Sequence, residues 1–186
     1  ERLRAADALS LAAIARLSEA ELAELVRPAG TPAAKARRLR ALAQLAHERG
    51  GLQRLLALPP DDLRPLLLAT YGVGPETADA ILLYAAGRPV FLIDAYTQRI
   101  FRRLDLGPDG DGYARWQRWF EDVLAPSPLA ASGGRGEGGL VDAYRRYHAL
   151  IVLHGKRTCR PRPRCDACCL LDLCPTGREQ TGVAAG

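Results

Sequence analysis

Residues 68–78 read LATYGVGPETA, and within them a Gly-Val-Gly turn separates two apolar segments of helical character. Gly72 and Gly74 permit a positive φ and leave backbone N–H groups uncovered. Pro75 suits the first position of the second helix, because a backbone N–H at that position would have no partner within the helix. Exposed amides at a helix start bind anions, and DNA phosphate is the obvious candidate. An ordinary helical hairpin explains the same residues, so this stretch alone leaves both interpretations open.

The rest of the chain also reads as a succession of helices, with no convincing strand. Ser18 and Glu21 form the pattern of a capping box, and Thr31 with Pro32 predicts a capped helix that stops near Gly50. Further helices are expected over residues 78–86, 95–104 and 141–153. Segments rich in glycine, proline and serine predict loops at 107–112 and 126–139, with 132–139 expected to be mobile. The pattern predicts an all-α fold.

Composition sets the outer bounds on size and partners. A chain of 186 residues suggests one domain or two small, closely packed ones. Lysine and arginine together number 26 against 21 acidic residues, which gives a net charge of +5. This modest positive charge is compatible with nucleic acid without establishing it, and no apolar run approaches the length of a membrane span. Only two of the cations are lysines, Lys35 and Lys156.

Four cysteines lie close together in the last third of the chain, at Cys159, Cys165, Cys168 and Cys174, with the spacing C-x5-C-x2-C-x5-C. The preceding 158 residues contain none. Three interpretations are open: disulfides, a structural zinc site and an iron–sulfur cluster. Zinc sites favour two short Cys-x-x-Cys pairs, whereas a single short pair between two longer gaps fits a cluster of four irons better. Cys169 either replaces Cys168 as a ligand or is a buried free thiol.

Asp94 follows the apolar triplet Phe91-Leu92-Ile93 and precedes the helix expected from residue 95. A carboxylate at this point is suited to cap the helix by accepting bonds from the amides of the first turn. It is equally suited to stand beside a cavity, oriented by the same cap. These two roles are compatible.

The hairpin, the aspartate and the four-cysteine loop occur in the order found in the helix–hairpin–helix DNA glycosylases of the endonuclease III superfamily, which this chain resembles over nearly its whole length. Residues 147–159 (YHALIVLHGKRTC) are similar to the family's approach to its cluster, as are residues 163–165 (PRC) and 172–175 (DLCP). The family has six residues between its first two cysteines, whereas this chain has five, which bears on the shape of the loop.

The resemblance implies two domains. Residues 1–88 would form a six-helix barrel domain that contains the helix–hairpin–helix, with its hairpin at 72–74. Residues 89–186 would form a smaller helical domain, with the catalytic aspartate at its start and a 4Fe–4S cluster on Cys159, Cys165, Cys168 and Cys174. Double-stranded DNA with a damaged base would bind across the cleft between them. Asp94 and the hairpin are therefore expected to open onto a common groove.

Glu76 stands where the family's bifunctional enzymes carry the lysine whose amine attacks the sugar. A carboxylate cannot form a Schiff base, and neither Lys35, on an earlier helix, nor Lys156, beside the cysteine loop, is a good substitute. The resemblance thus implies a monofunctional glycosylase that uses water. Residues 76–82 (ETADAIL), with Asp-Ala-Tyr at 94–96, look most like the branch that includes 3-methyladenine DNA glycosylases. Glu76 itself either lines the base pocket or is a solvated carboxylate at a helix start.

The chemistry follows from the bond to be broken. Cleavage of an N-glycosidic bond develops positive charge on the sugar, which a nearby carboxylate stabilises while it orients or deprotonates water. Asp94 is expected to take that role after the base has left the DNA stack. Contacts to DNA phosphates are expected from the hairpin and from the cations of the cysteine loop, namely Gly72, Val73, Gly74, Lys156, Arg157, Arg160, Arg162 and Arg164. Alternatively, the loop arginines neutralise thiolate charge and remain solvated.

Two other functions stay open. A bifunctional glycosylase and AP lyase would use another amine, such as a native N-terminus outside this chain. A non-catalytic protein that bears a cluster, binds DNA and senses lesions would use Asp94 only as a cap. We expect a monomer in the cytoplasm of a bacterial or archaeal cell, associated with the nucleoid through DNA. Tyr71, Tyr96 and His148 are expected to be pocket or packing residues.

Overall fold

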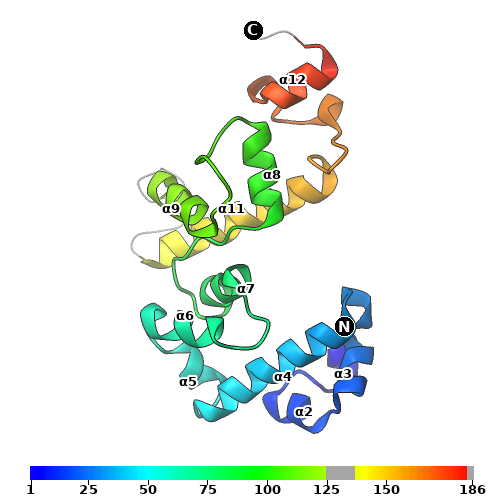
Figure 1. The fold of residues 1–186 in the computed structure, drawn as a ribbon, viewed down its shortest axis with the longest axis vertical. Helices are drawn as coiled ribbons and strands as arrows, with labels where there is room; N and C mark the ends of the chain where they lie inside the picture. Colours follow the sequence, from blue (N-terminus) through cyan, green and yellow to red (C-terminus); the bar gives the residue numbers. More distant parts are fainter. Residues whose placement is uncertain (125–136, 184–186) are drawn as a thin grey trace. The chain divides into compact units, whose positions relative to one another are not determined.

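The computed structural model describes residues 1–124 and 137–183, and every regular element within these ranges is helical, as the sequence predicts. The chain divides into two compact units, the first from Glu1 to Ala86 and the second from Gly87 to Gly186 (Figure 1). In the part of the chain that the structure describes, no helix is long and apolar enough to cross a bilayer. The hairpin belongs to the first unit, whereas Asp94 and the cysteines belong to the second.

The first unit consists of short helices and one longer helix, α4 (Pro32–Glu48), which packs against α2 (Leu11–Arg16) and α3 (Glu19–Val26). The remaining elements are α1 (Arg2–Ala5), the 3-10 turn η1 (Arg27–Ala29), α5 (Leu52–Leu56), α6 (Pro60–Leu68), α7 (Pro75–Ala80) and the π-helical turn η2 (Ile81–Ala85). The core of this unit is aliphatic and includes the fully buried Leu22, Leu63, Leu67, Leu82 and Leu83.

Two helix starts in this unit show how capping signals act. At α3, Ser18 Oγ accepts a bond from the Glu21 N–H at 3.2 Å, and Glu21 Oε2 accepts one from the Ser18 N–H at 2.8 Å, so the predicted capping box is confirmed. At α4, Pro32 occupies the first helical position as predicted, and the helix ends before Gly50. Thr31 is the N-cap of α4 as predicted, but it has a left-handed backbone (φ 44°) and its hydroxyl makes no cap bond within the described residues.

The Gly-Val-Gly turn joins α6 to α7, and its two glycines have different backbone conformations. Gly72 has φ +72°, a left-handed value that favours glycine, whereas Gly74 has φ −94°, which other residues also adopt. Arg64 on α6 holds Asp79 on α7 through two bonds of 2.7 and 3.1 Å, so the helices of the hairpin are tied together. Together, α7 and η2 form the helix predicted at residues 78–86, beginning three residues earlier and ending one residue earlier.

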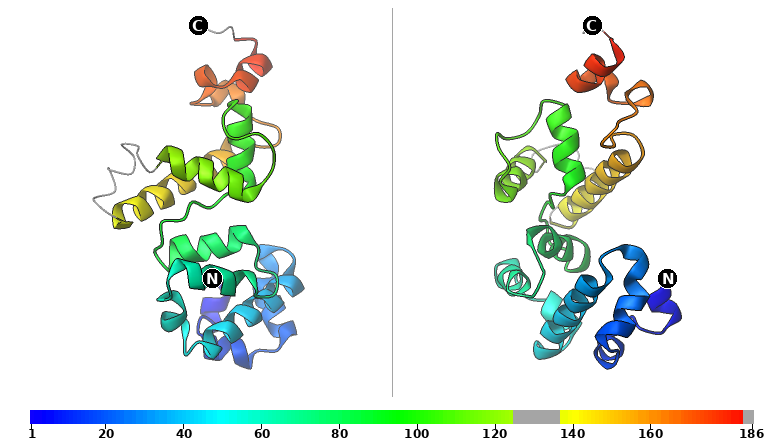
Figure 2. Two further views of the ribbon diagram at one scale, coloured as in Figure 1. Left: turned by 60° about the vertical axis from the view of Figure 1, so that its left-hand side comes forward. Right: turned by 45° about the vertical axis from the view of Figure 1, so that its right-hand side comes forward.

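The second unit contains two helices that lie side by side, α8 (Ala95–Arg103) and α11 (Glu137–Arg157) (Figures 1 and 2). They approach closely at Gly155, where a Cβ atom would lie 2.5 Å from the Tyr96 ring. α11 extends the helix predicted at 141–153 at both ends. The prediction that residues 137–139 belong to a mobile loop is wrong, because they form the first turn of α11; the rest of that predicted loop lies outside the described residues.

α9 (Tyr113–Leu124) is a helix that the sequence prediction did not include. Its buried residues Trp116, Phe120 and Leu124 recur every four positions and therefore share one face. Phe120 stacks on Phe91 with ring centres 4.6 Å apart, and it meets Phe101 of α8 edge-on at the same distance. These rings form the aromatic core of the second unit.

The cysteine segment follows α11 and has little regular structure. It contains two 3-10 turns, η3 (Cys165–Ala167) and η4 (Leu171–Leu173), before the short helix α12 (Pro175–Thr181). The loop predicted at residues 107–112 is confirmed between α8 and α9.

Candidate active site and cysteine cavity

Asp94 is the N-cap of α8, as the sequence predicts. Its Oδ1 accepts two bonds from Thr97, one from the backbone N–H at 2.7 Å and one from the hydroxyl at 2.8 Å. Thr97 is fully buried and Asp94 is 9% exposed. The cap therefore fixes the carboxylate through one oxygen and leaves Oδ2 for other partners.

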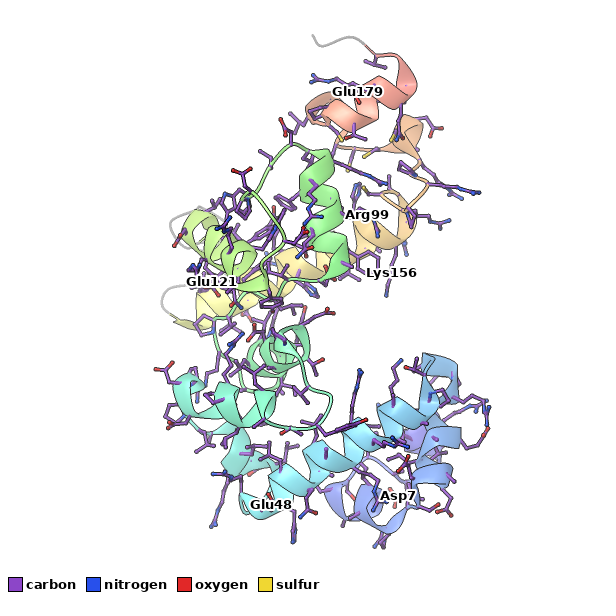
Figure 3. The ribbon with its side chains drawn as sticks, viewed as in Figure 1. Asp7, Glu48, Arg99, Glu121, Lys156 and Glu179 are labelled. Carbon is purple, nitrogen blue, oxygen red and sulfur yellow. The ribbon has the colours of Figure 1, made fainter. Side chains whose placement is uncertain are left out.

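The three residues before Asp94, which we call the strap (residues 91–93), run through the core without helical structure. The N–H of its first residue donates to Glu121 Oε1 at 2.9 Å, and the Gln117 amide donates to the carbonyl of the same residue at 2.8 Å. The N–H of its last residue donates to the Tyr113 hydroxyl at 3.3 Å. These three α9 residues recur every four positions, so one stripe of α9 supplies the bonds that buried backbone groups require (Figure 3 labels Glu121).

His148 on α11 faces the second oxygen of Asp94. Its Nε2 lies 3.4 Å from Asp94 Oδ2, and the two side chains are 12% and 9% exposed. This distance is longer than a well-formed N–H···O bond, so the contact is best described as an ion pair that exists when the imidazole is protonated. Asp94 thus has neutral donors on one oxygen and a titratable group at the other.

Opposing effects set the pKa of Asp94. Burial raises it, because the charged form loses solvation. The contact with His148 and the two bonds from Thr97 outweigh burial and hold the pKa of Asp94 below its ordinary value of 3.8. The carboxylate is therefore ionised at neutral pH although it is buried.

Two arginines on α8 join this helix to the end of α11 and to the cysteine segment. Arg99, which Figure 3 labels, donates to the Cys159 carbonyl at 2.9 Å and to the Gly155 carbonyl at 3.0 Å. Arg103, one turn further along, donates to Cys159 Sγ at 3.2 Å and to two carbonyls of the following loop at 2.6 and 3.0 Å. α8 therefore carries Asp94 at its start and holds the cysteine segment near its end.

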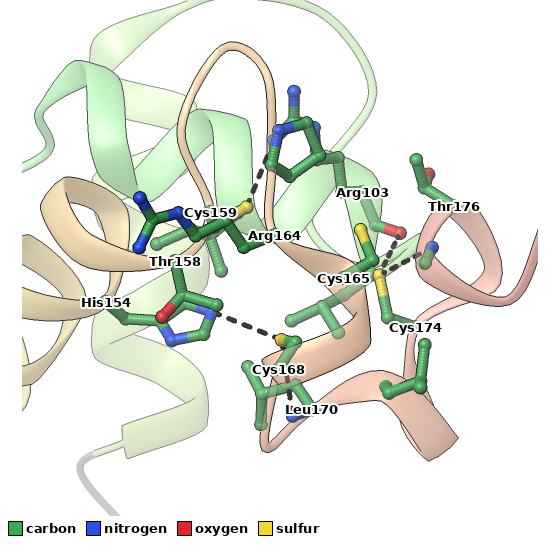
Figure 4. Close-up of a pocket in the computed structure, with 15 residues that line it drawn as sticks. Arg103, His154, Thr158, Cys159, Arg164, Cys165, Cys168, Leu170, Cys174 and Thr176 are labelled. Atoms are coloured by element: carbon green, nitrogen blue, oxygen red, sulfur yellow. Dashed lines mark hydrogen bonds between the residues drawn. The ribbon is translucent and has the colours of Figure 1, made fainter. Parts of the chain in front are cut away.

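The four cysteines that the sequence groups together line one pocket, as Figure 4 shows for Cys159, Cys165, Cys168 and Cys174. All five cysteines carry free thiols in the structure. Cys169 is exposed and does not line this cavity, so the structure groups Cys168 with the other three, and the interpretation of Cys169 as a buried thiol is wrong. Among the described residues, no three His, Cys, Asp or Glu side chains form a group that could hold a single metal ion.

Polar contacts surround the cysteine sulfurs. The Leu170 N–H donates to Cys168 Sγ at 3.4 Å, and the Gly177 N–H donates to Cys174 Sγ at 3.3 Å. Donors aimed at sulfur favour the thiolate, which is the form that binds iron or zinc. Burial raises the pKa of Cys165 and Cys168, and the neighbouring thiols add to the rise, so metal binding would displace protons from them.

The hairpin residues predicted to contact DNA lie in the first unit. Gly72 and Gly74 are exposed, whereas Val73 is 7% exposed, so Val73 can offer a phosphate only its backbone. Glu76 is exposed in the first turn of α7, where the helix dipole favours a carboxylate. The expectation that the hairpin and Asp94 open onto a common groove stays a prediction.

The cations predicted to contact phosphates are all exposed: Lys156, Arg157, Arg160, Arg162 and Arg164. Arg160 Nε donates to the Lys156 carbonyl at 2.8 Å. Within the described part of the chain, the arginine that donates to a cysteine sulfur is Arg103 of α8 rather than one of these. Sequence reasoning did not identify Arg103 or the α9 stripe, because both act on residues that are distant along the chain.

Comparisons with known proteins agree with this fold. Residues 1–126 match the family described as HhH-GPD superfamily base excision DNA repair protein. A provisionally named DNA repair glycosylase of Methanocaldococcus jannaschii is 38% identical over 92% of this chain and 74% of that protein. Endonuclease III of Treponema pallidum is 32% identical over 87% of this chain and 67% of that protein.

Solved structures give the same result. The 3-methyladenine DNA glycosylase MagIII of H. pylori, bound to 1,N6-ethenoadenine, has a TM-score of 0.69 at 28% identity, over 84% of this chain and 74% of that chain. A non-covalent endonuclease III–DNA complex also has a TM-score of 0.69, at 21% identity over 94% and 72% of the two chains, which is a likeness of fold alone. Because a family match over more than half of the chain coincides with these relatives and this fold, the chain belongs to the HhH-GPD superfamily of base excision repair DNA glycosylases, the endonuclease III superfamily.

Proposed function

We propose that this protein is a monofunctional DNA N-glycosylase that removes a damaged base by hydrolysis, with Asp94 as the key carboxylate. The observation that carries the proposal is the Asp94 site, where a buried carboxylate is fixed by the cap of α8 and is ionised at neutral pH. Family membership supports double-stranded DNA with a damaged base as the substrate.

The proposed mechanism uses the charge of Asp94. As the bond between base and deoxyribose breaks, the base leaves with the bonding electrons and the sugar acquires oxocarbenium character. A carboxylate held in place stabilises this cation without reorganising during the reaction. Because Thr97 engages Oδ1 twice, Asp94 is suited to act through its field and to orient water or take its proton, rather than to move as a nucleophile. Water then adds to the sugar carbon.

Hydrolysis is favoured over lyase chemistry by the residue types in the hairpin. Glu76, at the position that the family resemblance gives to the attacking lysine, is an exposed carboxylate and cannot form a Schiff base. Lys35 lies on α4, where its Nζ donates to the Ala29 carbonyl. Lys156 lies in the last turn of α11, next to the cysteine segment.

We also propose that Cys159, Cys165, Cys168 and Cys174 hold a 4Fe–4S cluster. The support is the convergence of four free thiols on one cavity, with N–H donors directed at two of the sulfurs. A single zinc ion would draw its four ligands to within about 2.3 Å of one point, whereas a cluster of four irons spreads its thiolates further apart. When bound, the cluster would supply cross-links that shape this loop.

Base release and strand cleavage, measured separately, test the proposal. Duplexes that each carry one alkylated, oxidised or deaminated base would be incubated with the protein, with and without borohydride. An alkylated purine is the first lesion to test, because residues 76–82 and 94–96 resemble the 3-methyladenine branch. We expect base release without strand nicking and without a trapped adduct. A borohydride-trapped adduct would show amine chemistry, and binding without release of any lesion would favour the lesion-sensing alternative.

The metal content tests the cluster independently of activity. Protein purified without oxygen should contain about four iron and four sulfide per chain and should show the absorption of an iron–sulfur cluster. Replacing Cys168 by serine should lower the iron content, whereas replacing the exposed Cys169 should not. One zinc per chain and no iron would contradict the proposal.

A further inference from the structure

We propose that His148 is a positioning residue that acts through Asp94: its neutral imidazole leaves the carboxylate with its full charge, and its protonated imidazole cancels that charge. The proposal rests on the proposed function, because it takes Asp94 as the group that stabilises the sugar cation. Its consequence is a pH dependence of base release that originates in one side chain.

The geometry assigns His148 to one oxygen of the carboxylate. Oδ1 of Asp94 is engaged by the N–H and the hydroxyl of Thr97, whereas Oδ2 lies 3.4 Å from His148 Nε2. His148 and Asp94 are 12% and 9% exposed, and they belong to helices that pack against each other in the same unit. The pair is thus fixed by the fold and largely shielded from solvent, which strengthens the effect of one charge on the other.

The charged and titratable groups around this pair identify His148 as the one that faces the Asp94 carboxyl. The charge of His148 contributes to the lowered pKa of Asp94. Burial raises the pKa of Tyr147, and burial with two acidic neighbours raises that of Tyr144 to about 12, so both phenols on α11 stay neutral. On α8, Arg99 and Arg103 are charged throughout this pH range and donate to carbonyls and to Cys159 Sγ. Glu121, the acidic residue of the α9 stripe, accepts a hydrogen bond from a backbone N–H of the strap.

The sign of the effect follows from the charge of the transition state. The sugar becomes positive as the base departs, so the net negative charge at the Asp94 site determines how well it is stabilised. An imidazolium 3.4 Å from the carboxylate offsets most of the negative charge that acts on the more distant sugar. Histidine is the side chain type whose charge changes nearest neutral pH, so the rate of base release should rise with pH as the imidazole loses its proton.

The test is single-turnover base release between about pH 5.5 and 8.5, an interval that brackets histidine titration. For the parent protein we expect the rate to rise on the order of tenfold, the size of one partly screened charge. His148→Gln, which is neutral at every pH, should flatten the profile and be at least as fast as the parent at the acid end. Loss of packing alone would lower the rate at every pH and keep the rise. His47→Gln, at an exposed position on α4, is the matched control and should keep the parental profile.

The outcomes separate this proposal from the proposed function. If Asp94→Asn loses base release while His148→Gln keeps the parental pH profile, the role of His148 is overturned and the function stands. If Asp94→Asn releases base as fast as the parent, or the parent releases none, the proposed function fails and the role of His148 fails with it. Where circular dichroism shows that His148→Gln is unfolded, His148→Asn replaces it under the same expectations.

Discussion

Among the described residues, each of the two units buries one aspartate, and the two carboxylates are held by different kinds of partner. In the first unit, Asp79 is fully buried and receives two bonds, of 2.7 and 3.1 Å, from the guanidinium of Arg64. In the second, Asp94 is 9% exposed, receives two bonds from the neutral donors of Thr97 and faces His148 at 3.4 Å. An arginine keeps its charge at any accessible pH, so the guanidinium permanently compensates Asp79.

This difference separates a structural carboxylate from a chemical one. The charge of a carboxylate that is paired with a bidentate guanidinium is largely compensated, so it exerts only a weak electrostatic field on a substrate. The two bonds of this pair nevertheless connect α6 to α7 and so fix the hairpin. A carboxylate fixed by neutral donors keeps its charge and its position together, which is what stabilisation of a developing cation requires. The same residue type is thus used for stability in one unit and, by the proposed function, for chemistry in the other.

The largest expected effect is on the rate of base release in Asp94→Asn. The amide oxygen of asparagine can still cap α8, so the fold should persist while the charge is lost. We expect single-turnover base release to fall by at least about 100-fold, the size of the effect when one preorganised electrostatic group is removed. Thermal unfolding, measured in parallel, should change little. An activity within a few-fold of the parent would show that Asp94 is only a cap.

Next in size is the loss of stability in Arg64→Met. This change leaves the Asp79 carboxylate buried without its guanidinium, which costs several kcal/mol in a fully buried pair. Because the Arg64 side chain is 33% exposed, we expect a smaller decrease of about 2–3 kcal/mol in the free energy of unfolding. Chemical denaturation measures it. At saturating DNA, folded Arg64→Met should keep the parental rate of base release, in contrast to Asp94→Asn.

Asp79→Asn provides the reverse comparison within the same pair. It removes the buried charge and leaves the partly exposed guanidinium, which water can solvate, so it should destabilise less than Arg64→Met. If Asp79→Asn instead abolished base release in folded protein, the distinction between a structural and a chemical aspartate would be lost.

A smaller effect is expected where the α9 stripe holds the strap before Asp94. Gln117→Glu keeps the shape of the side chain but replaces the donor to the Phe91 carbonyl with a second acceptor. We expect a loss of about 1–2 kcal/mol in stability, the cost of leaving a buried acceptor without its donor. Glu121→Gln is the matched control, because its amide oxygen can still accept from the Phe91 N–H. Equal effects of the two changes would show that the stripe acts only by packing.

The sequence predicts the local parts of this molecule and misses the parts that depend on contacts distant along the chain. The capping box at Ser18, the Asp94 cap and the hairpin turn at Gly72 were all predictable, because each is determined by residues within one or two turns. The stripe at Tyr113, Gln117 and Glu121 was missed although polar residues every four positions, offset from a buried aromatic face, are a readable helical signal.

The residues that contact the candidate site were harder to predict from the sequence than Asp94 itself. Nothing near Asp94 in the sequence indicates that His148 faces it, because the packing of α8 against α11 brings them together. Similarly, the cysteine spacing indicated the four-thiol cavity, but the Arg103 contact with Cys159 depends on α8, whose end lies more than 50 residues earlier in the chain. At Thr31 the sequence indicated the position of the N-cap but not its left-handed backbone.

The smallest expected effect is a difference in the pH dependence of stability at Asp94. Because the folded-state pKa of Asp94 is held below its ordinary value of 3.8, the ionised carboxylate contributes stability at pH values above that ordinary value. The contribution is lost as the pH falls through the folded-state pKa, when the bonds from Thr97 and the contact with His148 no longer act on a charge. The free energy of unfolding should therefore fall more steeply with acid in the parent than in Asp94→Asn. Thr97→Val removes one of the two Oδ1 donors and should lie between them, whereas identical acid dependence in all three proteins would mean that the cap does not discriminate between the charged and the neutral carboxyl group.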